Sequence, residues 1–221
     1  MKLVHPEISQ TIDFQCGRVN ELIIENQRFF RTFIEDINLG IAGFGSKTVL
    51  SLKDKPVDLS KYALVITEYA PLQLNKKTLI TKITQSLEKE ALNESNYVDT
   101  MGLVAQIENY LLGLSLSLPC EIEFGKISIG VLIKAMSPEI VESGKNTIEK
   151  LFDFMELVRE LERDKVYVLV SVRSYISDDE MESFLSTALS HDHKILLLES
   201  QARKKLEMTK RLIIDKDLCE I

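Results

Sequence analysis

Two apolar runs in the last third of the chain, with a helix signal between them, restrict the fold more than any other feature. Residues 165–172 and 194–199 lack the alternation of polar and apolar side chains, which is typical of strands covered on both faces. Residues 177–190 between them are long enough to return the chain to the start of a parallel strand. We therefore predict a strand, helix, strand unit inside an α/β sheet.

The segment 177–190 begins with Ser-Asp-Asp-Glu, a capping box in which Ser177 and Glu180 satisfy the first unpaired amides of a helix. Negative side chains at a helix N-terminus are stabilised there by roughly 0.3–1 kcal/mol each. We therefore interpret these acids as a helix start and not as catalysts.

Length and composition are those of a globular protein. The 221 residues suffice for one large domain or two small ones, with 45% hydrophobic and 28% charged residues. No run approaches the roughly 18 apolar residues of a membrane span, and the start carries no signal region, so we expect a cytoplasmic protein with no membrane partner. Cys16, Cys120 and Cys219 are far apart, and we expect reduced thiols that are buried or incidental.

The net charge of −7 argues against a uniformly basic nucleic-acid-binding protein. Affinity for DNA comes from cations placed near phosphates, so a local basic patch is compatible with an acidic chain. Basic residues cluster at Lys76, Lys77 and Lys82, at Lys126 and Lys134, and at Arg203, Lys204, Lys205, Lys210 and Arg211. Each cluster by itself is also typical of a solvated face.

The middle of the chain carries helical periodicity. Apolar residues recur at helical spacing in a helix that Asn75 can cap, in residues 97–116, and in a helix that begins at Asn146. Residues 62–67 are the best strand of the first half. We predict an α/β head formed by residues 1–71 and 161–221, with a helical insertion of residues 72–160.

Residues 40–48, Gly-Ile-Ala-Gly-Phe-Gly-Ser-Lys-Thr, nearly form a phosphate-binding loop, but Ser46 separates the last glycine from the lysine. Such a loop needs a strand before it and a helix after it. Here the preceding residues have a helical pattern and residues 48–52 that of a strand. We interpret the segment as a glycine-rich turn and keep a nucleotide-dependent P-loop-type enzyme as an alternative.

His191-Asp192-His193 supplies at most two or three metal ligands, and no cysteine is near it in sequence. A polar turn before the next strand is the better interpretation. His5 is the only other histidine of the sequence, and no serine or cysteine nucleophile pattern is present. A histidine-based acid/base enzyme therefore has little support.

Glu121 and Glu123 flank Ile122, and in an extended segment both carboxylates would point the same way. Such a pair can share a hard cation such as calcium. The alternative is the solvated face of a strand.

A series of short segments, none diagnostic by itself, runs in a fixed order along the chain. They are residues 64–67, which lead through Asn75 into the long helix, 127–129 with 132–135, 146–150, 165–170, 176–181, 195–199 and 214–217. In order and spacing they resemble the Csn-two (Csn2) family, the small accessory adaptation proteins of type II-A CRISPR loci. The predicted head with a helical insertion matches the two-domain fold of that family.

The resemblance implies an NTPase-like head, of the RecA or P-loop type, without a functional phosphate loop. It implies a non-enzymatic homotetrameric ring that takes double-stranded DNA from free ends, without reading sequence and without a nucleotide. The role would be the acquisition of new spacers, beside the adaptation integrase and the effector nuclease of the same locus. The remaining alternative is a structural assembly subunit that does not bind DNA directly.

The resemblance also assigns residues. Lys134 matches a family lysine, and with Lys76, Lys77, Lys82, Lys126 and Lys145 it is predicted to contact phosphates from the helical insertion. Relatives hold calcium near the stretch that matches Glu121 and Glu123, which are therefore candidate ligands. Gly125, Lys126 and Val131 stand here where such relatives carry further acids, so Lys126 could supply the charge of the ion.

Overall fold

The computed structural model describes residues 1–14 and 17–221. The chain divides into two compact units, residues 1–72 with 144–221 and residues 73–143. Cys16 lies outside the described residues. Cys120 and Cys219 are free thiols, as expected, and both are exposed, so neither is buried in the core.

A five-stranded sheet forms the centre of the first unit, in the order β6-β7-β8-β3-β9. Every neighbouring pair is parallel. The strands are β3 (Val19–Ile24), β6 (Ala63–Ile66), β7 (Val166–Val170), β8 (Lys194–Glu199) and β9 (Thr209–Ile214). The predicted strand, helix, strand unit is confirmed as β7, α7 (Asp178–Ser190) and β8, because β7 and β8 pair in parallel from Val166↔Lys194 to Val170↔Leu198.

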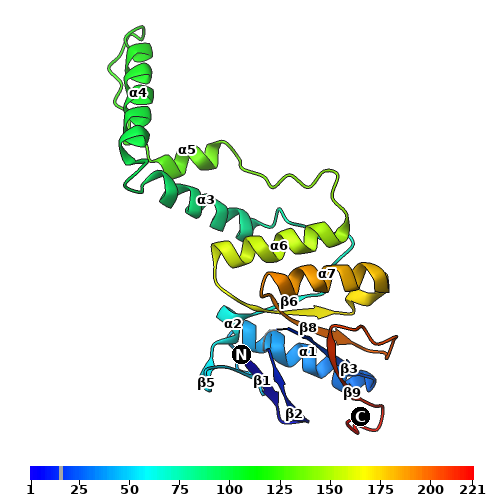
Figure 1. Ribbon diagram of the computed structural model, residues 1–221. Coiled ribbons are helices and arrows are strands. Elements are labelled where there is room, and N and C mark those ends of the chain that lie inside the picture. The colour runs from blue at the N-terminus through cyan, green and yellow to red at the C-terminus, as the bar shows by residue number, and fades with distance from the viewer. Residues whose placement is uncertain (15–16) are drawn as a thin grey trace. The chain divides into compact units, whose positions relative to one another are not determined.

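Helices cover both faces of this sheet (Figure 1). Helix α1 (Gln27–Ile41) packs Phe29, Phe33 and Ile37 into the apolar core of one face. On the other face lie α7 and α6 (Thr147–Leu161), and the Tyr167 hydroxyl of β7 donates a hydrogen bond of 2.8 Å to the Met155 carbonyl of α6. Coverage on both sides explains why β7 and β8 are apolar without alternation.

A second sheet is antiparallel, in the order β2-β1-β4-β5, and packs into the same core as α1. Its strands are β1 (Lys2–His5), β2 (Ile8–Asp13), β4 (Val49–Leu52) and β5 (Lys55–Val57). The short helix α2 (Leu59–Tyr62) follows, capped by Asp58, whose side chain accepts from the Ser60 amide at 2.9 Å. Because α2 extends to Tyr62, β6 begins only at Ala63, which lies within the predicted strand of residues 62–67.

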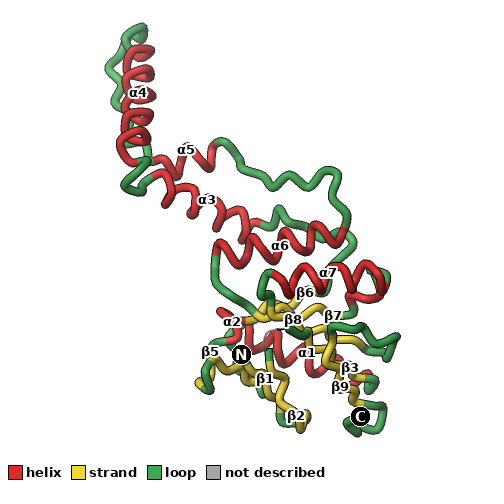
Figure 2. The backbone as a smooth tube through the Cα atoms, in the orientation of Figure 1, coloured by secondary structure: helices red, strands yellow, loops and turns green. Residues whose placement is uncertain are grey.

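The second unit consists of helices and loops over its described residues, as Figure 2 shows. The helices are α3 (Lys77–Ala91), α4 (Tyr97–Ser115) and α5 (Ile129–Ala135). Across the described ranges of the whole chain, no helix is both long and apolar enough to span a membrane.

The boundary between the units differs from the predicted one at its C-terminal side. We predicted a helical insertion through residue 160, whereas α6 belongs to the first unit. The reason is its apolar face: Leu151, Met155 and Val158 are all buried. Periodicity identifies such a helix but does not show which body its apolar face covers.

A buried ion network joins β3 to three other parts of the first unit. The Glu21 side chain, fully buried in the middle of β3, accepts from Arg173 Nη1 at 2.7 Å and from Arg211 Nε at 2.8 Å. Arg173 lies in the 3-10 turn η1 (Val172–Ser174) after β7, and its Nη2 donates to Asp178 at the start of α7 at 2.7 Å. The network therefore connects β3, β9, η1 and α7.

Removing the charge of Glu21 should destabilise this unit strongly. Breaking a buried pair by removing one partner typically costs about 3–5 kcal/mol, because the other charge remains buried. We expect Glu21→Gln to lower the free energy of unfolding, measured by urea denaturation, by an amount in that range. The control is Asp164→Asn, which removes an exposed partner of Lys194 at 3.0 Å; an equal effect of the two substitutions would contradict the prediction.

Candidate nucleic-acid interface

Two of the lysines predicted to contact DNA line one open groove in the second unit. Lys77 stands in the first turn of α3 and Lys134 in the last turn of α5. The groove measures about 520 Å³ and is lined by Asn75, Lys77, Ile80, Thr81, Thr84, Lys134, Ser137, Pro138 and Glu139. The structure thus brings together two cations that the sequence places on different helices.

Asn75 holds the segments on either side of this groove. Its Nδ2 donates to the Ile140 carbonyl at 3.0 Å and its Oδ1 accepts from the Ile140 amide at 2.7 Å. The Nδ2 group also donates to Glu142 at 2.9 Å. We predicted Asn75 as a helix cap, and this was wrong: the N-cap is Lys76, because the side chain of Asn75 is used by Ile140.

Gly130 lets α5 approach α3 closely. A Cβ atom at this position would meet the carboxyl of Glu88 on α3, with Oε1 at 2.5 Å.

On α3, Thr81 and Thr84 donate to the carbonyls of Lys77 and Ile80, at 2.8 and 2.9 Å. Their hydroxyl hydrogens are therefore occupied within the helix, and the lysine ammonium groups are the charged donors of the groove.

The other predicted lysines lie elsewhere. Lys76 directly precedes α3 and is exposed, Lys82 is half-buried on α3, and Lys126 is exposed in the loop before α5. The predicted location of Lys145 was wrong. Lys145 belongs to the first unit and not to the helical one, and its Nζ pairs with Asp153 of α6.

Glu121 and Glu123 are exposed in a loop without regular structure, so the segment is not the extended strand considered from sequence. Calcium takes six to eight oxygens, and two carboxylates supply at most four. Within residues 1–14 and 17–221, no group of three or more His, Cys, Asp and Glu side chains is placed to hold a metal ion. These two residues by themselves do not fit calcium.

The glycine-rich turn of residues 40–48, which nearly matches a phosphate-binding loop, binds a carboxylate of the chain itself. As predicted, a helix precedes it and a strand follows, since α1 ends at Ile41 and β4 begins at Val49. The amides of Lys47 and Thr48 donate to Asp36 at 2.7 and 2.8 Å, and the hydroxyls of Ser46 and Thr48 donate to it at 2.7 Å each. Donors that would face a phosphate in a P-loop are thus occupied by Asp36.

The two histidines near the end of α7 meet Glu156 of α6. His193 Nε2 lies 2.6 Å and His191 Nδ1 3.4 Å from Glu156 Oε1. Burial lowers the pKa of His193, although the hydrogen bond to Glu156 acts in the opposite direction. The motif is a polar turn, as predicted, and it also anchors α6. Spacing alone could not show this, because Glu156 is remote in sequence.

The comparisons with known proteins agree with this architecture. The crystal structure of Stu0660 of Streptococcus thermophilus has a TM-score of 0.62 to this chain at 16% identity, over 97% of this chain and 74% of that one. At this identity the likeness shows a shared mixed α/β fold. The family model described as CRISPR-associated protein (Cas_Csn2) matches residues 43–218, so the chain belongs to the Csn2 family. The predicted family is confirmed, and it indicates a CRISPR-associated adaptation protein.

Asp36 gives the glycine turn a pH-dependent stability. Burial raises the pKa of Asp36, but hydrogen bonds from Thr48, Lys47 and Ser46 together lower it to about 2, from 3.8. A lowered folded-state pKa stabilises the protein above the unfolded-state pKa, and this stabilisation is lost as the pH falls to the folded-state value.

We therefore expect Asp36→Asn to reduce the free energy of unfolding at pH 7 by about 1–3 kcal/mol, since hydrogen bonds to a charged group are lost. The difference from the wild type should shrink between about pH 4 and pH 2. Urea denaturation across this pH range measures it. Glu35→Gln, at the neighbouring exposed carboxyl, is the control and should change little; a wild-type stability of Asp36→Asn at pH 7 would contradict the prediction.

Proposed function

We propose that this chain is a non-enzymatic DNA-binding protein that assembles into a homotetrameric ring on the ends of double-stranded DNA. The proposed role is spacer acquisition in a type II-A CRISPR system, beside the adaptation integrase and the effector nuclease. The observation that supports it most is the groove in which Lys77 of α3 and Lys134 of α5 lie together. The cytoplasmic location stays a prediction.

Charge supports a polyanion as the partner of this groove. The whole chain carries a net charge of −7, so cations gathered on one surface are not a by-product of a basic composition. Lysine acts as a point charge toward phosphate, and such contacts bind DNA without reading its sequence. The groove also contains Glu139, which limits its net charge and favours an extended ligand that reaches further lysines.

Helix α4 supports self-association. Its apolar residues are spread over most of its circumference, its charged residues are Asp99 and Glu108, and its buried residues are Thr100 and Val104. Large apolar side chains stand exposed on it and just beyond it: Tyr97, Val98, Met101, Leu103, Tyr110, Leu112, Leu114, Leu116 and Leu118. A helix of this kind belongs in a protein interior. In the proposed tetramer, a second copy of this chain covers it.

The sheet supports an NTPase-like head that has no phosphate loop. In doubly wound sheets, ligands bind outside the carboxyl ends of the strands. Here β3 connects to α1 through Glu25 and Asn26, without a glycine. The first turn of α1 is capped by Asn26, which accepts from the Phe29 amide at 3.0 Å. One of the amides that could hold a phosphate is therefore satisfied by the chain itself, which supports a protein without nucleotide chemistry.

Calcium has weaker support in the described residues. Glu121 and Glu123 would need oxygens from other groups to complete a calcium site. Lys126 lies three positions beyond Glu123 and is exposed. We propose that Lys126 supplies here the positive charge that an ion could supply, so that DNA binding does not require calcium.

The groove lysines should govern DNA affinity. We expect Lys77→Glu with Lys134→Glu to weaken binding of a linear duplex and to make the slope of log K against log salt less steep by about two, one for each lost phosphate contact. Gel shifts with linear and covalently closed duplexes of one sequence, with calcium and with chelator, measure affinity, end preference and calcium dependence.

Lys89→Glu, on α3 but outside the groove lining, is the matched control. Undiminished affinity of the double variant, in a protein that keeps its assembly state, would remove the groove from the interface. Loss of binding in the chelator lanes would contradict the proposal for Lys126.

The exposed face of α4 should govern assembly. We expect Val98→Glu with Tyr110→Glu to convert the tetramer into smaller species, because each substitution places a charge on an apolar contact. Size-exclusion chromatography with light scattering measures the mass. Phe44→Glu, at a position 82% exposed in the first unit, is the control and should remain tetrameric. A monomeric wild-type protein would contradict the proposed tetrameric ring.

A further inference from the structure

The loop between β8 and β9 in the first unit carries three consecutive cations, Arg203, Lys204 and Lys205. All three residues are exposed. The sequence showed this cluster and gave it no function, because a charge run by itself is typical of a solvated face. The structure adds how the loop is held.

Two arginines, buried Arg173 and half-buried Arg211, bind the backbone of this loop. Arg173 Nη2 donates to the Lys204 carbonyl at 2.8 Å, and Arg211 Nη2 donates to the same oxygen at 3.0 Å. Arg211 Nη1 donates to the Arg203 carbonyl at 2.8 Å. These guanidinium groups are themselves fixed by the fully buried carboxylate of Glu21. The carbonyls of residues 203 and 204 are therefore tied to the centre of the sheet.

The loop is anchored on both sides of these carbonyls. Leu206 is 1% exposed, and the Glu207 amide donates to Glu182 of α7 at 2.7 Å. Arg203 donates to the Arg173 carbonyl and, at 3.2 Å, to Ser174 Oγ. A loop of nine residues with this many attachments presents its side chains from a fixed backbone.

Charge balance leaves the outer cations available. Arg173 and Arg211 are matched by Glu21 and Asp178, two charges of each sign. Buried Glu199 accepts from the Arg173 amide at 3.2 Å, and burial raises its pKa. The ions of the network thus largely neutralise one another. Lys204 and Lys205 are exposed, and the acids near the loop are Asp178, which interacts with Lys204, together with Glu182 and Glu207.

We propose that the loop of residues 200–208 is a second contact surface for the phosphate backbone of duplex DNA, located in the first unit and separate from the groove of the second. The inference rests on the proposed DNA-binding function. A loop whose backbone is already fixed loses less conformational entropy when it binds DNA. This gain offsets part of the free energy that the buried ion network costs.

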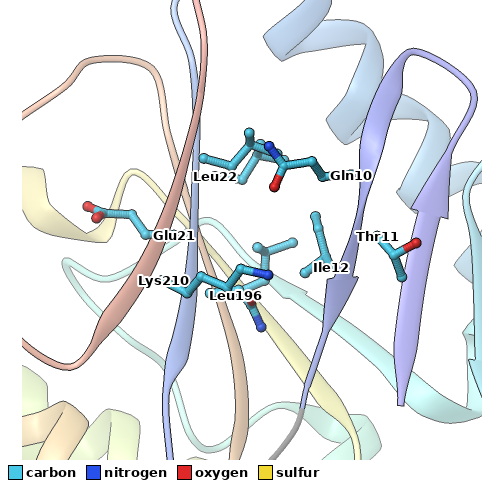
Figure 3. Close-up of a pocket in the computed structure, with 9 residues that line it drawn as sticks. Gln10, Thr11, Ile12, Glu21, Leu22, Leu196 and Lys210 are labelled. Atoms are coloured by element: carbon cyan, nitrogen blue, oxygen red, sulfur yellow. The ribbon is translucent and has the colours of Figure 1, made fainter. Parts of the chain in front are cut away.

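Lys210 provides a matched control. It lies on β9 five residues beyond Lys205, is exposed, and lines a small pocket with Gln10, Ile12 and Leu212. Figure 3 shows Glu21 pointing away from this pocket, on the opposite side of the β3–β9 pair from Lys210. A charge reversal at Lys210 therefore changes the net charge by the same sign but on the other face of the sheet.

The test compares the full chain with Lys204→Glu/Lys205→Glu, Lys210→Glu and Lys77→Glu/Lys134→Glu in binding a fluorescent linear duplex over a salt series. We expect the loop variant to bind several-fold more weakly, with a salt slope less steep by about two, and Lys210→Glu to bind like the wild type. Lys204→Gln/Lys205→Gln guards against misfolding, and Lys204→Arg/Lys205→Arg should retain affinity. Polyglutamate serves as a non-nucleic polyanion.

The outcomes separate the two ideas. No binding by the wild type at any salt overturns the proposed function and this inference together. Wild-type affinity of both the Glu and Gln loop variants, while the groove variant is weakened, overturns the inference alone. An equal loss in Lys210→Glu also overturns it, since net charge would then explain the effect. A loop variant that loses polyglutamate binding but keeps DNA binding would assign the loop to an acidic protein instead.

Discussion

The burial of one carboxylate in the middle of a parallel sheet is the constraint on which the first unit depends. Glu21 lies on β3, between β8 and β9, and its side chain is fully buried. A charge in such a place is tolerated only with close counter-charges, so Arg173 and Arg211 must both reach it. Their positions in turn fix η1, the start of α7 and the loop after β8. One strand residue thereby helps to place three other chain segments.

Three strands of the central sheet, β6, β7 and β8, could be predicted from sequence because their signals are local, whereas β9 was not predicted. The apolar runs of β7 and β8 and the capping box at Ser177 require no knowledge of distant residues. The capping box is present as predicted, with Ser177 and Glu180 serving each other's backbone. The glycine segment was also read correctly as a turn, since the helix before it and the strand after it are both encoded nearby.

Features that depend on distant pairs could not be predicted. Asn75 and Ile140 are far apart in sequence, so nothing local indicated that Asn75 would leave the helix cap. The assignment of α6 to the insertion failed for the same reason, because its contacts with Tyr167 of β7 and with His193 join residues that are distant in sequence. Of the six lysines proposed for DNA, the structure places Lys77 and Lys134 on one groove and Lys145 in the other unit. Charge alone does not reveal such groupings.

The position of the glycine turn in the chain also opposes phosphate binding by residues 40–48. It follows α1 and so lies at the carboxyl end of that helix, where the peptide dipoles sum to a partial negative charge. A phosphate would be repelled there, even if Ser46 were deleted to restore the P-loop spacing and Asp36 were neutralised. Conversion to a nucleotide site would require the loop to stand before a helix, which is a change of chain connectivity and not of side chains.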